Sequence, residues 1–350
     1  MYRTRLGALL LILITAASAA VVSPDADSEP VRLAIAGPEV ELHFAWAAAR
    51  ELTRLAAEKG IEVEVEPAPL AGSSEITWDL MVMPVRSLAT QVPALEVLEL
   101  PFFYPSLAAV HANLDGALGE RLDTEASQRG WRIVAFWDEG MHILSGLKRF
   151  DRVRNLKARE FLITRPDPIA ERQLRYWKAD ARRIQPENRE AVLRECLIAS
   201  RATTLQEVMR EQLYRVHLAM SLSYHRYEGW VVVAPLERWM QLPTSRRAAI
   251  EAALTEIRAW QRRDTEQREA AALAELKTRG MTLYDLDAAE RAAFAAALPD
   301  RAELMSNTLS PAQKRALIDL ASAGTAAFVA PAGPPGAQPA GAAPPDPQDH

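Results

Sequence analysis

The chain has 350 residues, of which 25% are charged and 49% are apolar, and its formal net charge is −5. This length is too great for one simple core and indicates two lobes of roughly 100 to 150 residues each. The negative net charge disfavours a nucleic-acid-binding role, and the single cysteine, Cys196, excludes an internal disulfide.

The N-terminal segment 1–20 has the pattern of a secretory signal peptide. Arg3 and Arg5 precede the apolar run 6–16, and the small residues 17–19 supply a cleavage site. The alternative is an uncleaved membrane anchor, for which the run is short. We therefore expect this segment to be removed and the secreted protein not to insert into the membrane.

The first part of the mature chain alternates strands with a helix. Apolar runs predict strands at 31–36, 61–66 and 78–83, and an amphipathic helix is predicted at 41–59. Strand, helix and strand in succession favour a parallel sheet with a right-handed crossover. Only 72–77 remain to form a helix before the third strand, so the helix expected between the second and third strands is nearly missing from this lobe.

The next stretch is rich in aromatic residues. Residues 98–100 are predicted to end a buried strand. A helix is predicted over 106–129, because its apolar residues recur at helical spacing and Gly130 follows. The strand after it, 131–137, is expected to end in a polar turn at 138–140.

The remainder of the chain favours a second α/β lobe. The longest predicted helix, 244–279, is far longer than usual, begins with Thr244 as N-cap and is expected to run across both lobes. The tail 331–350 holds too few apolar residues to offset its ordering entropy and is expected to be disordered. The other predicted elements are strands at 160–164 and 228–234 and helices at 167–178, 187–197, 285–298 and 310–324.

Several short motifs follow one another along 31–320. They are Leu-Ala-Ile-Ala at 33–36, Leu-Pro-Phe-Phe at 100–103, Ala-Phe-Trp-Asp at 135–138, Lys-Arg and Asn-Leu-Lys within 148–157, and Trp-Val-Val-Val with Trp, Leu and Pro within 230–243. In order and spacing they resemble the solute-binding proteins of tripartite ATP-independent periplasmic (TRAP) transporters, DctP type.

This resemblance implies an α/β fold of the two-lobed periplasmic binding protein type, with a long helix spanning both lobes. The first lobe is expected at 31–150, with return segments from the C-terminal half. The second lobe, the long helix and the C-terminal helices are expected at 151–325. The implied location is the periplasm.

The resemblance also implies a cleft in which an arginine at the end of a second-lobe strand holds a ligand carboxylate. Two charge-assisted hydrogen bonds suit that pairing. In this chain Leu162 stands at the arginine position, and Arg165 follows three residues later. Arg165 is therefore either the replacement or a solvated loop charge before a proline.

Other candidate ligand residues carry alternatives too. Thr203 takes the place of a hinge-side asparagine of the family, and Arg201 is either an added cleft charge or an exposed loop residue. His142 is either an anion donor whose charge follows the pH or a structural histidine. Trp137 and Trp230 either wall the cleft or pack in the core.

Three functions follow from these observations. The first is a periplasmic receptor that captures a small organic solute, with an organic acid as the expected class, and delivers it to the membrane subunits of a TRAP permease. The second is a degenerate scaffold with a protein-interaction or sensory role. The third, an enzyme, is disfavoured because the sequence contains no nucleophile elbow, phosphate loop or metal-spaced cluster. We expect no cofactor, no metal and no nucleic-acid partner.

Overall fold

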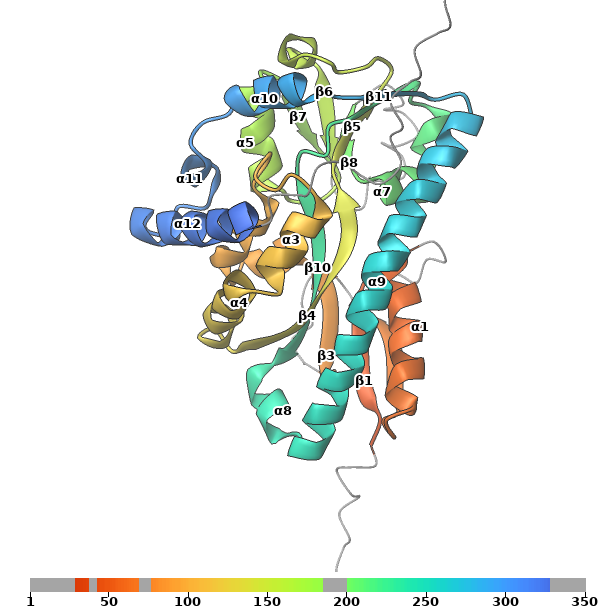
Figure 1. Ribbon diagram of the computed structural model, residues 1–350, viewed down its shortest axis with the longest axis vertical. Helices are drawn as coiled ribbons and strands as arrows, with labels where there is room; N and C mark the ends of the chain where they lie inside the picture. The colour runs from red at the N-terminus through yellow and green to blue at the C-terminus, as the bar shows by residue number, and fades with distance from the viewer. Residues whose placement is uncertain (1–28, 38–42, 69–76, 185–199, 328–350) are drawn as a thin grey trace, which may run out of the picture.

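The computed structural model describes residues 29–37, 43–68, 77–184 and 200–327. These residues form two α/β lobes, one below the other in Figure 1, with the 35-residue helix α9, Thr244–Thr278, lying along both. The predicted signal peptide 1–20, the helix 187–197 and the tail 331–350 lie outside the described residues. Among the described helices, none is both long enough and apolar enough to span a bilayer.

The first lobe is built on a five-stranded sheet of order β2-β1-β3-β10-β4. β1 pairs in parallel with β2 and β3, as the strand-helix-strand pattern predicts, whereas β10 is antiparallel to β3 and β4. The strands are β1 Val31–Ala36, β2 Val63–Ala68, β3 Leu80–Pro84, β4 Trp131–Met141 and β10 Tyr227–Pro235. The predicted first strand is confirmed, and the next two lie about two residues further along.

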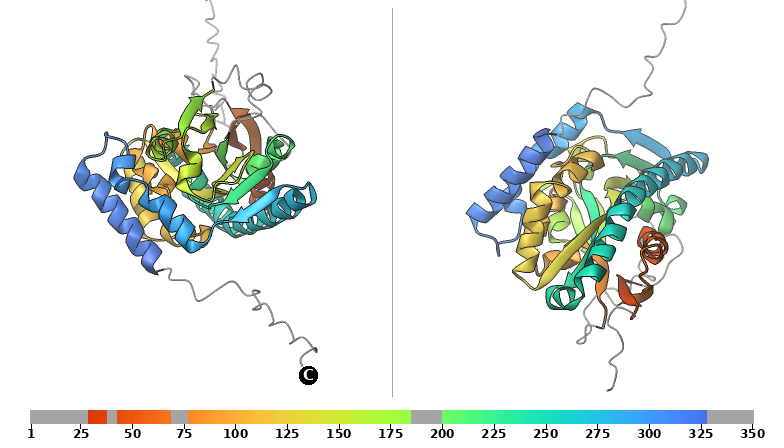
Figure 2. Two further views of the ribbon diagram at one scale, coloured as in Figure 1. Left: turned by 90° about the horizontal axis from the view of Figure 1, so that it is seen from above. Right: turned by 60° about the horizontal axis from the view of Figure 1, so that its bottom comes forward.

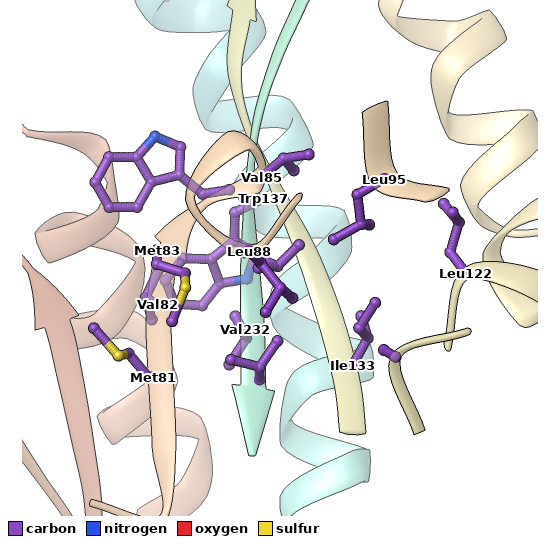
Figure 3. Packing of buried hydrophobic residues seen from close by; sticks show 14 of the residues in the cluster. Met81, Val82, Met83, Val85, Leu88, Leu95, Leu122, Ile133, Trp137 and Val232 are labelled. Carbon is purple, nitrogen blue, oxygen red and sulfur yellow. The ribbon is translucent and has the colours of Figure 1, made fainter. Parts of the chain in front are cut away.

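Helices cover this sheet and bury a continuous apolar core. They are α1 Phe44–Ala57, α2 Val85–Ala89, the 3-10 helix η1 Pro93–Glu99, α3 Leu107–Leu114, α4 Ala117–Ser127, α8 Leu236–Gln241, α11 Arg301–Leu304 and α12 Pro311–Ala327. Figure 3 shows Trp137 of β4 among Val82, Leu88 and Val232 of neighbouring elements. Burial of such side chains is the main favourable term for this lobe.

Two of the predicted elements of this lobe are wrong. Residues 98–100 do not end a strand, because Pro93 starts the 3-10 helix η1 and its apolar residues are buried there. The predicted helix 106–129 is two helices, since Gly116 is extended, with φ −115° and ψ −158°. A helical period alone does not reveal such a break.

The predicted turn at 138–140 is also wrong, because β4 continues through these residues. Asp138 is held by the Tyr227 hydroxyl at 2.8 Å and by His111 at 2.7 Å. Glu139 accepts a hydrogen bond from the Trp230 indole at 3.0 Å. Because these polar side chains have partners inside the protein, they sit in a buried strand rather than in a solvated turn.

The second lobe contains a four-stranded sheet of order β11-β9-β5-β8 and a parallel pair, β6-β7. Phe161 of β6 also bridges to Ser200, next to β8. The strands are β5 Ile143–Gly146, β6 Glu160–Ile163, β7 Asp180–Arg183, β8 Arg201–Thr203, β9 Ala219–Leu222 and β11 Thr282–Asp285. The helices are η2 Val153–Leu156, α5 Pro168–Tyr176, α7 Leu205–Arg210, η4 Leu213–Arg215 and α10 Ala288–Ala296.

Two strand connections pass between the lobes side by side. β4 leads into β5 through His142, and β9 leads into β10 through 223–226. The backbone N–H of His142 donates to the Arg226 carbonyl at 2.7 Å, and that of His225 donates to the His142 carbonyl at 2.9 Å. Backbone hydrogen bonds therefore join the two connections where the chain passes between the lobes.

Helix α9 binds the two lobes together along its length. Ile250 and Ile257 are buried in the first-lobe core, and Leu276 is buried against the second lobe. Near the middle, Gln261 bonds both backbone groups of Asp138, at 2.9 and 2.8 Å. Figure 2 shows α9 alongside α1 at one end. Thr244 is the first helical residue rather than the N-cap, which is Pro243.

The break between α3 and α4 gives a stability prediction. A Cβ at Gly119 would lie 2.0 Å from the Leu114 carbonyl oxygen, a backbone atom. Gly119→Ala should therefore lower the free energy of unfolding by about 1–3 kcal/mol, since the backbone must shift. Ser127→Ala, on the same helix, is the control and should change stability little. Urea denaturation of both variants is the measurement, and equal midpoints would contradict the packing described.

Candidate functional site

A small, charged cavity lies where the lobes meet at the crossover. Its volume is about 30 Å³, room for about one water molecule. Residues from both lobes and from the crossover line it. The charged ones are four arginines and four carboxylates, namely Arg86, Arg165, Arg201 and Arg226 with Glu139, Asp167, Glu207 and Glu228.

One group of these charges joins the first lobe to the second. Asp167, the N-cap of α5, accepts from two nitrogens of Arg226 at 2.9 and 2.7 Å and lies 3.0 Å from Arg86 of α2. Arg86 also pairs with Glu228 of β10 and lies 3.6 Å from Glu99. Asp167 is thus a carboxylate of the second lobe held by a guanidinium of the first.

A second group surrounds helix α7. Arg210 of α7 lies 2.9 Å from Glu139 of β4. Arg201 of β8 pairs with Glu207 at 3.1 Å and with Glu211 at 2.9 Å. Arg201 and Glu139 are buried, so each of these ion pairs is largely shielded from solvent.

The paired carboxylates are held as anions. Burial alone would raise the pKa of Asp167, but Arg226 and Arg86 outweigh it and lower that pKa below its usual value. Burial opposes ionisation of Glu139 and Glu207 as well, yet neighbouring arginines lower the pKa of both. These groups therefore stabilise the fold above the unfolded pKa of about 4, and this contribution is lost as the pH falls below it.

Arg165 differs from the other arginines that line the cavity. It follows β6 by two residues and is partly buried, yet no hydrogen bond or ion pair joins it to another residue in the described part of the chain. Burial lowers the pKa of Arg165, which the carboxylates of Glu207 and Glu139 only partly offset. The guanidinium stays charged at neutral pH, because an arginine pKa starts above about 12. Leu162, at the family's arginine position, is a buried β6 residue that lines the same cavity.

His142 lines the cavity as an uncharged ring. Its Nε2 lies 2.9 Å from Glu228, and its Nδ1 lies 3.3 Å from Arg226. Burial, and next the Arg226 charge, lower the pKa of His142 well below its usual value. The expectation that its charge follows the pH of the compartment is therefore wrong.

The other candidate residues divide between the cavity wall and its support. Arg201 lines the cavity in a buried strand and is not an exposed loop residue. Thr203 donates to Glu207, and the Trp230 indole donates to Glu139, so both support a lining carboxylate. Trp137 lies fully buried in the first-lobe core and is not among the residues that line the cavity.

Most of the charged lining was missed from sequence. Arg86, Asp167, Arg226 and Glu228 lie far apart along the chain and carry no motif that joins them. One available signal was Asp167 immediately before Pro168, a helix N-cap followed by a proline at the first helical position. That signal places the carboxylate at the start of α5 but not at the lobe interface.

Together, the two α/β lobes and the spanning helix define a fold of the two-lobed periplasmic binding protein type, with a charged cavity between the lobes. A family model described as Bacterial extracellular solute-binding protein, family 7 (DctP), matches residues 75–305. The chain belongs to this family, the solute-binding proteins of TRAP transporters. Proteins of this family act in the periplasm.

Individual relatives are distant in sequence but cover most of the chain. The C4-dicarboxylate-binding periplasmic protein DctP of Rhodobacter capsulatus is 25% identical over 308 residues, which is 83% of this chain and 90% of that protein. The 2,3-diketo-L-gulonate-binding periplasmic protein YiaO of Escherichia coli is 22% identical over 236 residues, covering 66% and 70%.

Solved structures share the fold. A TRAP solute-binding protein from Ochrobactrum anthropi superposes with a TM-score of 0.75 at 21% identity, covering 85% of this chain and 96% of that one. Another, from Shewanella oneidensis with bound succinate, has a TM-score of 0.72 at 18% identity, covering 85% and 100%. The predicted fold class is confirmed.

The bridge between the lobes gives a second prediction. Asp167→Asn keeps a good helix cap but leaves Arg86 and Arg226 without their shared anion. Removing one partner of a buried pair should lower the free energy of unfolding by about 3 kcal/mol. Asp300→Asn, at the exposed cap of α11, is the matched control and should cost far less. If chemical denaturation gives the two variants equal losses, the bridge is not stabilising.

Glu269 of α9 gives a prediction about pH. Burial raises its pKa to about 7, and its Oε1 has no hydrogen-bond partner among the described residues. A raised folded-state pKa means that stability is lost as the pH rises from about 4.5 through 7. Glu269→Gln should therefore stabilise the protein by about 1–3 kcal/mol at pH 8 and much less at pH 5.

The matched control for this experiment is Glu251→Gln, an exposed residue on the same helix whose charge is not among those that raise the pKa of Glu269. Thermal unfolding of both variants across pH 5–8 measures the difference. A gain at Glu269 that does not depend on pH would contradict the raised pKa.

Proposed function

We propose that the protein is a periplasmic receptor that captures a small organic acid between its lobes and delivers it to a TRAP permease. The observation that carries this proposal is Arg165, a guanidinium that lines an interlobe cavity without an ion-pair partner among the described residues. A carboxylate would complete its pairing through two charge-assisted hydrogen bonds.

The similar proteins support the acid part of the proposal. Two relatives are described as binding C4-dicarboxylates, and solved neighbours hold succinate, L-malate, orotic acid and β-D-galacturonate. All of these ligands carry a carboxylate. The proposed route to the periplasm is cleavage of the signal peptide 1–20. The proposed first lobe comprises 31–150 with return segments from the C-terminal half, such as β10, and the proposed second lobe, with the long helix and the C-terminal helices, falls within 151–325.

Binding and release follow from the arrangement of the lobes. A cavity of about 30 Å³ is too small for these acids, so the lobes must separate for a ligand to enter. The crossover at His142 and 223–226 is where the chain passes between the lobes, and the Arg86–Asp167 pair is a contact that must open. The proposed role is capture and delivery, with no covalent chemistry.

A thermal-shift screen with organic acids, keto acids and sugar acids tests this proposal. A ligand at about 100 times its dissociation constant stabilises the folded state by about 2.7 kcal/mol, so the melting temperature should rise. Arg165→Met should abolish the rise. Arg175→Met, on the exposed face of nearby α5, is the charge-matched control and should retain it.

An acid that stabilises the wild type and both variants alike would reject Arg165 as the ligand anchor. If no acid stabilises the wild type, the receptor function fails, and the degenerate scaffold with a protein-interaction or sensory role becomes the better account.

A further inference from the structure

Resting on the proposed function, we infer that this cleft selects a monocarboxylate bearing a hydroxyl or keto oxygen and rejects dicarboxylates. The inference concerns what surrounds Arg165 rather than Arg165 itself. It separates this chain from relatives described as binding C4-dicarboxylates.

The first argument is the balance of charge in the cavity wall. Four arginines and four carboxylates line it, and Arg210 on Glu139 and Glu211 on Arg201 add one further group of each sign. Glu139 and Asp167 are buried and paired, and their pKa values are lowered, so both stay ionised at neutral pH. A dicarboxylate would add two negative charges to a wall that is already balanced.

The second argument is that the other guanidinium groups are committed. Arg226 is bidentate to Asp167, and Arg201 bridges Glu207 and Glu211. Arg86 pairs with Asp167 and Glu228. A second ligand carboxylate would have to displace one of the protein's own carboxylates. The displaced group would then be a buried, unpaired charge, which is strongly unfavourable.

The third argument concerns the donors that remain. The Nε–H groups of Arg201 and Arg226 are buried and have no acceptor within the described residues. Both side chains line the cavity, and unmet buried donors are costly. A hydroxyl or keto oxygen would accept from such a donor without adding charge. One carboxylate for Arg165 and an uncharged oxygen for a second arginine therefore define the ligand class.

Isosteric pairs of ligands test this inference directly. Malate and succinate are each compared by isothermal titration calorimetry with their monoamide, in which one carboxylate is replaced by a carboxamide. In the malate monoamide the replaced carboxylate is the one remote from the hydroxyl. Lactate and propionate form a third pair that differs by the hydroxyl. The wild-type protein should bind each monoamide at least tenfold more tightly than its diacid, and lactate more tightly than propionate.

Two variants locate the effect in the cleft. Arg165→Met should remove binding of the monoamides. Glu228→Gln removes one wall carboxylate. It should reduce the ratio of the diacid and monoamide dissociation constants by a factor of roughly ten, because a single charge changes. Circular dichroism of both variants checks that they fold. The wild-type comparison stands even if a variant does not.

The outcomes separate this inference from the proposed function. If the diacids bind as tightly as their monoamides or more tightly, the inference is overturned while the acid-receptor function stands. Binding of propionate equal to that of lactate overturns the hydroxyl part. If none of these compounds nor any acid of the wider screen binds the wild type, the proposed function itself fails, and the inference with it.

Discussion

An ionised side chain that is buried on folding needs a partner of opposite charge, and the centre of this protein is arranged around that requirement. Asp167 meets Arg86 and Arg226, and Glu139 meets Arg210, all at the junction of the lobes. Removing one member of such a pair costs far more than the pair contributes overall. The pairs therefore fix where the lobes touch and which charges a ligand encounters.

The scaffold brings these charges together from distant parts of the chain. Strand β4 runs from the first-lobe core through Glu139 into the crossover, and β10 returns beside it with Glu228. Gln261 of helix α9 forms hydrogen bonds with the backbone N–H and carbonyl of Asp138, so the strand that leads into the crossover is fixed to this helix. Beyond Asp138, the side chains of His142 and Arg226 line the cavity between the lobes.

The sequence predicted the fold better than the site, and the reason is physical. Strand β1 and helix α9 can be predicted from the local spacing of their apolar residues. The end of α9 can be predicted from Gly280, which adopts the left-handed conformation with φ +79°. Arg165 was found because a resemblance pointed to its neighbourhood. Glu228 and Arg86 could not be predicted as site residues, because they form an ion pair with each other across 142 positions of sequence. Trp137 illustrates the converse, since an aromatic residue in a strand suits a core or a cleft equally well.

A crystal structure of the protein with the acid that stabilises it most is the most direct test of the central claim. The account predicts a ligand carboxylate on Arg165, with the Asp167–Arg226 and Glu139–Arg210 pairs intact around it. A ligand carboxylate on Arg226 or Arg201, with the protein's own carboxylate displaced, would contradict the account. So would a ligand that occupies another part of the molecule.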